Sequence, residues 1–242
     1  MQRRQISDIK RRLFAIVLFT LCPCGYLQAQ THNCSLKLDQ LGQPAELYNL
    51  RLGMSQEEVK KALPLAAFGF PDALGLLKTS FNPHYDQRVD NQAFTDVRTI
   101  SLDFLDGRLA TLWIGYESTF KWPKLDEFVP NFSKSLGLPA DWPVKRNGRE
   151  LKCDGFSVFA VSIAGGPSLR LTNDAAETLF DARREAALEA AENEVIGDTR
   201  SKSYYPSDCS IRDSVPPASR IVFKNKDEAK KGGYILAKDC RQ

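Results

Sequence analysis

The chain has 242 residues, of which 43% are hydrophobic and 26% are charged. This composition is that of a globular protein, and the length suffices for one large domain or two modest ones with a packed core. The formal net charge is +3 at neutral pH. The first 29 residues carry five basic side chains against one aspartate, so the rest of the chain is near −1 and the overall basic charge does not indicate nucleic-acid binding.

Residues 1–29 have the pattern of a cleaved secretory signal. The basic segment MQRRQISDIKRR precedes the nine-residue apolar run LFAIVLFTL, and the small Ala29 stands before Gln30. A helix needs roughly 20 apolar residues to span a membrane, so this run is too short for an anchor. We therefore predict an exported protein, periplasmic or secreted after cleavage near Ala29-Gln30, with no transmembrane segment in the mature chain.

Four cysteines remain after cleavage: Cys34, Cys153, Cys209 and Cys240. An even number of cysteines in an exported chain predicts disulfides, because no cytosolic reductant acts there. Three pairings of four cysteines are possible.

The first part of the mature chain predicts a helix and a hairpin. Residues 47–64 have the pattern of a strand leading into a helix, with Ser55 and Glu58 as a capping box and Pro64 at the end. Residues 65–92 are rich in Gly, Pro and Asn and predict an ordered loop. Residues 97–117 alternate apolar and polar side chains around Asp106-Gly107, which predicts a β-hairpin.

The following residues predict a helix over 124–139, with a kink or break at Pro130, and then several strands separated by the turn pairs Asn147-Gly148 and Asp154-Gly155. Residues 174–196 are alanine-rich and predict a long helix that begins with a capping box of Asp174 and Glu177. This helix can pack on the body as a terminal helix, lead to the next domain, or do both. The fold class is therefore α+β, an antiparallel sheet with flanking helices, over residues 30–196.

The segment RLGMSQEEVKKAL at residues 51–63 is similar to the Gly-Met-Ser/Thr segment that begins the BamE/SmpA-type envelope lipoproteins. This resemblance implies an envelope binding module in the body of the protein.

Residues 197–242 form a second predicted domain with a net charge of +4, from ten basic and six acidic side chains. A short strand over 220–224 precedes a helix that Asn225 caps and Gly232-Gly233 ends. The segment resembles the metal-binding domain of the Ada DNA-repair protein. The residues that carry the resemblance include Ser201-Lys202, Tyr204, Cys209, Arg220, Phe223, Asp227-Glu228-Ala229, Gly233-Tyr234 and Cys240.

The Ada-type domain holds zinc with four thiolates, and one of them accepts a methyl group from DNA. Cys209 matches the first ligand and Cys240 the last, whereas Asp213 and Ala237 stand at the second and third positions. The resemblance therefore implies a small α/β domain in which Cys209 and Cys240 form a disulfide, which leaves Cys34 to pair with Cys153. The alternative is residual zinc bound by Cys209, Asp213 and Cys240; otherwise we expect no cofactor.

We expect a non-enzymatic exported protein that binds or scaffolds an envelope or extracellular partner, because no catalytic motif surrounds His32 or His84. The first alternative is nucleic-acid binding through the second domain. Its predicted contacts are Arg200, Lys202, Arg220, Lys224, Lys226, Lys230 and Lys231. A second alternative is an enzyme whose site is formed by residues 65–92 over the sheet.

Overall fold

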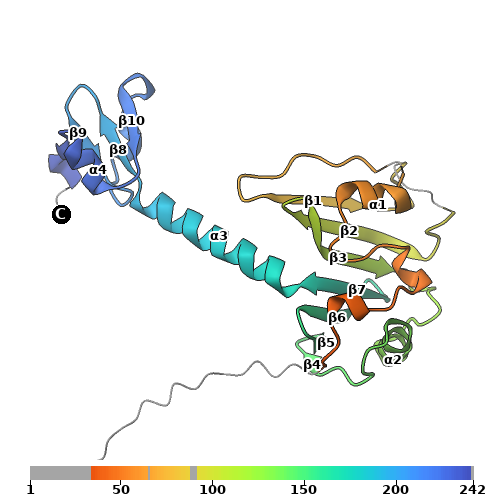
Figure 1. Ribbon diagram of the computed structural model, residues 1–242. Helices are drawn as coiled ribbons and strands as arrows, with labels where there is room; N and C mark the ends of the chain where they lie inside the picture. Colours follow the sequence, from red (N-terminus) through yellow and green to blue (C-terminus); the bar gives the residue numbers. More distant parts are fainter. Residues whose placement is uncertain (1–33, 65, 88–91, 241–242) are drawn as a thin grey trace, which may run out of the picture. The chain divides into compact units, whose positions relative to one another are not determined.

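The computed structural model describes residues 34–64, 66–87 and 92–240 (Figure 1). The predicted signal at residues 1–29 and His32 lie outside these ranges. The described chain forms a seven-stranded sheet in the order β1-β2-β3-β7-β6-β5-β4 and a four-stranded sheet in the order β10-β8-β9-β11. All pairings in the first sheet are antiparallel, which confirms the α+β class.

The strands of the first sheet are β1 (Leu76–Phe81), β2 (Val97–Leu105), β3 (Arg108–Tyr116), β4 (Val144–Lys145), β5 (Gly148–Lys152), β6 (Phe156–Ile163) and β7 (Gly166–Asn173). The strands of the second sheet are β8 (Val195–Asp198), β9 (Ser203–Tyr205), β10 (Arg220–Phe223) and β11 (Ile235–Leu236). The α-helices are α1 (Gln56–Ala62), α2 (Leu125–Leu136), α3 (Asp174–Asn193) and α4 (Lys226–Lys231).

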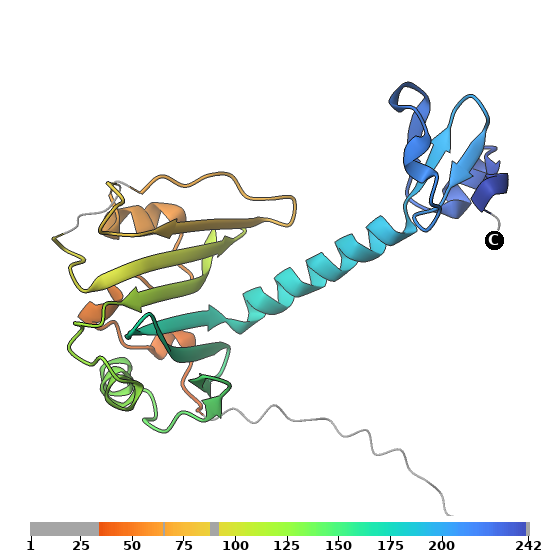
Figure 2. The same cartoon turned by 180° about the vertical axis from the view of Figure 1, so that it is seen from behind.

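One face of the seven-stranded sheet carries the hydrophobic core. Alternate residues of β2 and β3, such as Leu102 and Ile114, are buried there with Val59 of α1 and with Phe128 and Phe132 of α2. The N-terminal segment adds Leu47, Leu50 and Leu52 to this core. The opposite face of β2, β3 and β7 carries polar and aromatic side chains, as expected for an antiparallel sheet with one solvated face. Figures 1 and 2 show the backbone of this sheet from the front and from behind.

Several local predictions are confirmed. Asp106 and Gly107 both have positive φ, the conformation of a tight hairpin turn between β2 and β3. The capping box at α1 is present, since Ser55 accepts from the amide of Glu58 and Glu58 accepts from the amide of Ser55. Helix α2 ends at Leu136, directly before Gly137.

Other local predictions are wrong. Residues 48–54 form no strand, because Tyr48 and Asn49 adopt left-handed φ values that interrupt an extended chain. Residues 65–92 are not only a loop, since β1 lies within them and pairs with β2. The Asp174–Glu177 capping box is replaced by Asn173, whose side chain accepts from the amide of Ala176 at 3.1 Å.

Pro130 does not break α2, which continues through it to Leu136. The proline removes one hydrogen bond to the carbonyl of Asp126. Both Asp126 and Pro130 are exposed, so water can reach that carbonyl.

The four-stranded sheet has its own small core of Val195, Tyr204, Phe223, Ala229 and Tyr234. The disulfide between Cys209 and Cys240 is confirmed. The predicted helix capped by Asn225 is present as α4. The side chain of Asn225 accepts a hydrogen bond from the amide of Glu228. The sheet begins at Val195, two residues before the predicted boundary at residue 197, because Val195 and Ile196 belong to β8 and not to the long helix.

Asp198 at the end of β8 is buried and accepts hydrogen bonds from the amide and guanidinium of Arg200. These bonds, the backbone one foremost, lower the pKa of Asp198 to about 2. The carboxylate is therefore a fixed acceptor at the turn that follows β8.

We predict that replacing Cys209 and Cys240 by serine destabilises the four-stranded sheet by about 3.7 kcal/mol, because the disulfide closes a loop of about 32 residues in the unfolded chain. Amide hydrogen exchange of β8 and β10 measures this loss. All three tryptophans, Trp113, Trp122 and Trp142, precede α3, so their fluorescence follows the other sheet and serves as the internal control. Unchanged exchange in β8 and β10 would contradict the prediction.

We also predict that Asp198 contributes to the acid sensitivity of the same sheet. Its folded pKa of about 2 lies below the ordinary value of 3.8, so its stabilisation is complete above pH 3.8 and is lost as the pH falls toward 2. Asp198→Asn should lower the stability of β8 near pH 6 and flatten its decline between pH 4 and pH 2. A decline as steep as in the wild type, followed by hydrogen exchange, would assign the acid sensitivity to other groups.

Candidate binding groove on the open face of the sheet

The candidate functional site is a groove of about 550 Å³ between the open face of the seven-stranded sheet and the first half of α3. Pockets that hold small molecules fall in this range of volume. The floor is formed by side chains of β1, β2, β3 and β7, and the roof by α3. The lining residues that matter below are Lys78, Asp103, Thr111, Trp113, Arg170 and Thr172 on the floor and Glu177, Phe180, Asp181 and Arg184 on the roof.

The floor is organised around Arg170, which lies on β7, the central strand of the sheet. Arg170 is directly opposite Trp113 of β3 on one side and Phe159 of β6 on the other. Its guanidinium carbon lies 5.9 Å from the centroid of the Phe159 ring, within the range of a cation–π contact. The buried Nε atom of Arg170 has no hydrogen-bond partner among the described residues.

The other cations around the groove have partners. Lys78 pairs with Asp103 at 3.4 Å and Arg184 pairs with Asp181 at 3.0 Å. Arg98, on the same face of the sheet, donates to the carbonyls of Tyr116 and Ile163 and to Ser168 Oγ. No ion pair within the described ranges includes Arg170. Its guanidinium contacts the Phe159 ring but, unlike the neighbouring cations, has neither an acidic partner nor a hydrogen bond to a described residue.

A clamp between α3 and the hairpin turn holds the roof over the floor. Arg183 donates to both carboxylate oxygens of Asp106, at 2.9 and 2.8 Å, and to the carbonyl of Leu74 at 2.8 Å. The hydrogen bonds from Arg183 lower the pKa of Asp106, so this carboxyl is ionised at neutral pH. Gly75 is required beside the clamp, because a Cβ there would lie 2.5 Å from Asp106 Oδ1 and 2.8 Å from Arg183 Nη1.

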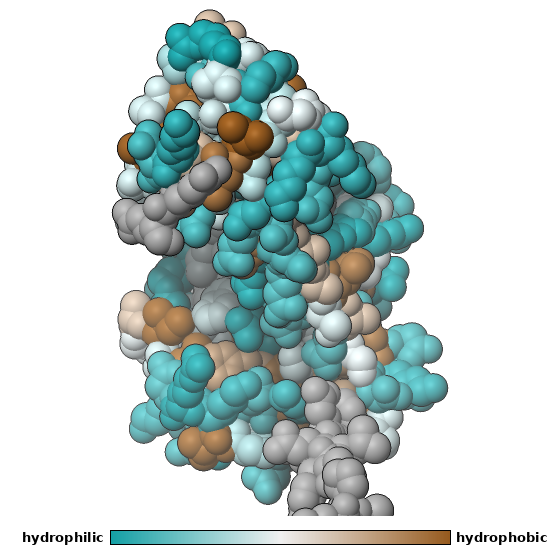
Figure 3. Space-filling model, turned by 90° about the vertical axis from the view of Figure 1, so that its left-hand side faces the viewer, coloured by the Kyte–Doolittle hydropathy of each residue, from teal (hydrophilic) through white to brown (hydrophobic). Residues whose placement is uncertain are grey.

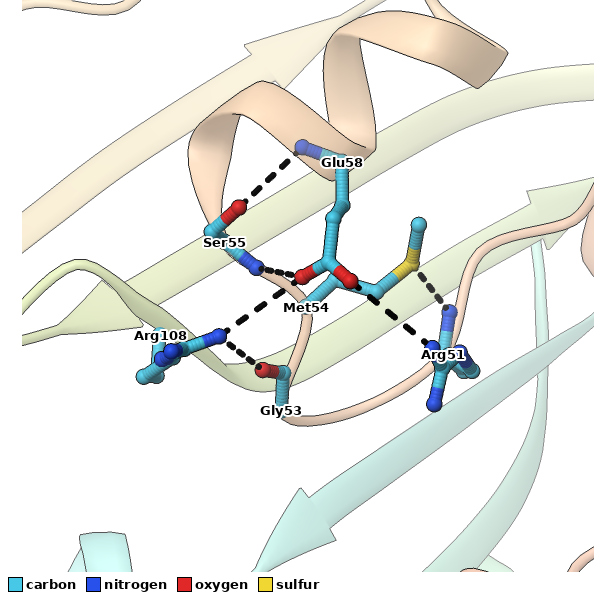
Figure 4. Close-up of polar contacts among 6 residues, drawn as sticks. All are labelled: Arg51, Gly53, Met54, Ser55, Glu58 and Arg108. Carbon is cyan, nitrogen blue, oxygen red and sulfur yellow. Dashed lines mark hydrogen bonds and ion pairs between the residues drawn. The ribbon is translucent and has the colours of Figure 1, made fainter.

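A second polar cluster surrounds Glu58 at the start of α1 (Figure 4). Glu58 accepts from the amide of Ser55 at 2.7 Å and pairs with Arg108 at 3.6 Å and with Arg51 at 3.9 Å. The bond from the Ser55 amide is the main cause of the lowered pKa of Glu58. Arg108 also donates to the carbonyl of Gly53, so the cluster joins α1 to the start of β3 and has a structural role.

The four cysteines form the two disulfides that the resemblance implied, Cys34 with Cys153 and Cys209 with Cys240. Asp213 lies in a 3₁₀ helix, Arg212–Ser214. Within the described ranges, no three His, Cys, Asp or Glu side chains lie close enough together to hold a metal ion. Zinc bound by Cys209, Asp213 and Cys240 would require the disulfide to be reduced, and it stays a prediction.

Of the seven residues predicted to contact nucleic acid, four contact other residues of the protein. Arg200 binds Asp198, and Arg220 donates to the carbonyls of Asp213 and Val215. The ammonium of Lys202 lies 4.8 Å from the Tyr234 ring centroid, and Lys230 pairs with Asp227 at 3.5 Å. Lys224, Lys226 and Lys231 have no ion pair with a described side chain. Nucleic-acid binding stays a prediction.

The surface gives no broad apolar face in the view of Figure 3, where hydrophobic side chains form small patches between hydrophilic ones. Exposed apolar residues, such as Phe70, Leu188 and Val222, lie on different elements. Helices in the described part of the chain are all too short or too polar to cross a membrane.

Comparison of the chain with protein-family models, with curated proteins and with solved structures gives no match. The function is therefore inferred from the geometry of the chain itself.

None of the residues that line the groove was predicted from the sequence to bind a ligand. The signal was present in the alternation of β3 and β7, where Trp113 and Arg170 occupy outward positions between buried neighbours. Their proximity follows only from the pairing of β3 with β7, which are separated in the chain by α2 and three strands. Residues 65–92 do contribute to the groove, through Leu76 and Lys78 of β1.

We predict that Arg183→Gln releases the roof, because glutamine cannot make the two-oxygen contact with Asp106. Amide hydrogen exchange in residues 174–184 should rise severalfold, while exchange in β2 and β3 stays as in the wild type. Arg184→Gln is the matched control, since the ion pair that this neighbouring arginine makes with a described residue is with Asp181 of its own helix. Equal effects of the two substitutions would show that charge on α3, and not the clamp, holds the helix.

Proposed function

We propose that the chain is an exported, non-enzymatic binding protein of the bacterial envelope and that its ligand occupies the groove between the open sheet face and α3. The observation that carries this proposal is the unpaired guanidinium of Arg170, placed between two aromatic side chains on the floor of a groove of about 550 Å³. Burying a charged group without a hydrogen-bond partner costs free energy, unless a ligand or water supplies the missing hydrogen bonds.

Export is supported by the two disulfides, which persist in oxidising compartments. The signal pattern in residues 1–29 supports the same compartment. A binding role is supported by the state of the groove carboxylates, since Asp103 and Asp181 are engaged by Lys78 and Arg184. Groups that are already paired suit the holding of a ligand better than proton transfer.

The four-stranded sheet is proposed to be a degenerate relative of the Ada-type domain, retained as a folding unit. Support comes from the positions of Cys209 and Cys240, which match two of the four zinc ligands of that family and are joined here as a disulfide. Half of that family's ligand set is replaced, so its methyl-transfer chemistry is not part of the proposal.

We predict that Thr111→Trp blocks the groove, because Thr111 lies on its floor and the new indole would fill the space under α3. Protein isolated from the envelope fraction and analysed by native mass spectrometry should carry a small molecule, and the variant should lose most of it. Ser157→Trp is the matched control, since Ser157 lies on the same face of the sheet but does not line the groove.

The proposal fails if wild-type protein from the envelope carries no additional mass. It also fails if the Thr111 and Ser157 variants retain the same molecule to the same extent.

A further inference from the structure

We propose that the groove recognises a ligand with a single carboxylate on a flat, largely apolar body, and that Arg170 binds the carboxylate. This inference rests on the proposed function, because it names the ligand class of the same groove. It is argued from the chemistry of Arg170, from the pairing of its neighbours and from the charge of the lining.

Arg170 presents a planar donor group in a fixed place. The side chain rises from the middle of the central strand, and its neighbours across the sheet are Trp113 and Phe159. A guanidinium carries five N–H donors in a planar fork that matches the two oxygens of a carboxylate. The Phe159 ring lies 5.9 Å from the guanidinium carbon and Trp113 stands opposite on the other neighbouring strand, so the two aromatic side chains limit where the Arg170 side chain can lie and less ordering is needed when a carboxylate binds.

Comparison with the neighbouring cations shows why Arg170 is the one expected to bind the ligand. Lys78 and Arg184 line the same groove but are neutralised by Asp103 and Asp181. Arg98 and Arg183 are used to hold strands and helix together. Only Arg170, among the described cations that line the groove, has neither an acidic partner nor a hydrogen bond to the protein.

The charge of the lining favours a monoanion over a dianion. The groove contains three cations, Lys78, Arg170 and Arg184, and three carboxylates, Asp103, Glu177 and Asp181. Two of the carboxylates are paired, and Glu177 is exposed in the first turn of α3, where the helix dipole favours a negative charge. A dianionic phosphate would meet one free cation and three carboxylates, whereas a carboxylate is balanced by Arg170 alone.

The rest of the lining defines the body of the ligand. Trp113 beside Arg170 and Phe180 on the roof offer two aromatic surfaces, and Leu76, Leu105 and Ala110 are apolar. Thr111 and Thr172 are cross-strand neighbours on the floor, and each hydroxyl can donate one hydrogen bond and accept others. This lining suits a flat apolar body with few polar groups.

The test uses two probes that differ only in the headgroup, the carboxylate 4-phenylbutanoate and its neutral amide 4-phenylbutanamide. The indole N–H resonance of Trp113, one of three in the chain, is assigned by Trp113→Phe and followed by NMR titration of the full mature protein. We expect the carboxylate to shift this resonance with at least tenfold higher affinity than the amide. Arg170→Gln should remove that difference, while Arg149→Gln, the matched control that removes a paired arginine outside the groove lining, should change it less than twofold.

Arg170→Lys tests whether the loss in Arg170→Gln is merely structural. Lysine keeps the positive charge but lacks the planar guanidinium, so this variant should retain part of the preference for the carboxylate. Equal binding of both probes at Trp113, unchanged in Arg170→Gln, would overturn the carboxylate inference and leave the binding groove intact. Failure of both probes to move the Trp113 resonance at millimolar concentration would overturn the groove as a ligand site and the inference with it.

Discussion

The register of the three central strands is the constraint on which the candidate site depends. Antiparallel pairing of β7 with β3 and β6 places Arg170 opposite both Trp113 and Phe159. A slip of one residue would turn these side chains toward the core and expose Leu169 and Leu171, which are almost completely buried. The packing of the core therefore fixes the arrangement of the groove floor, although the two lie on opposite faces of the sheet.

Much of the fold follows from short-range patterns in the chain. The β2–β3 hairpin, the capping of α1 by Ser55 and the capping of α4 by Asn225 are predictable because each depends on residues within a few positions of one another. The disulfide pairing was implied by a family resemblance and by the cysteine count, because the sequence spacing of the cysteines does not determine it.

The features that escaped prediction depend on contacts between distant segments. Strand β1 lies in a Gly- and Pro-rich region and is defined by its pairing with β2. The continuity of α2 through Pro130 depends on the exposure of Asp126, which local sequence does not reveal. The groove is the extreme case, since β1, β2, β3, β7 and α3 all contribute to it and the pairing of β3 with β7 crosses a large part of the chain. Polar residues on an outward face look like solvated surface until the roof over them is known.

The two disulfides have a consequence for the order in which the chain is oxidised. Cys34 and Cys153 are 119 residues apart, and Cys209 and Cys240 follow as a second pair 31 residues apart. If the chain is exported from its N-terminus and the predicted signal with Cys22 and Cys24 is cleaved, Cys153 is the first partner that Cys34 meets, and Cys209 emerges only after both. Pairing of cysteines in order of emergence therefore gives the native disulfides, so oxidation can keep pace with translocation without thiol–disulfide exchange to correct it.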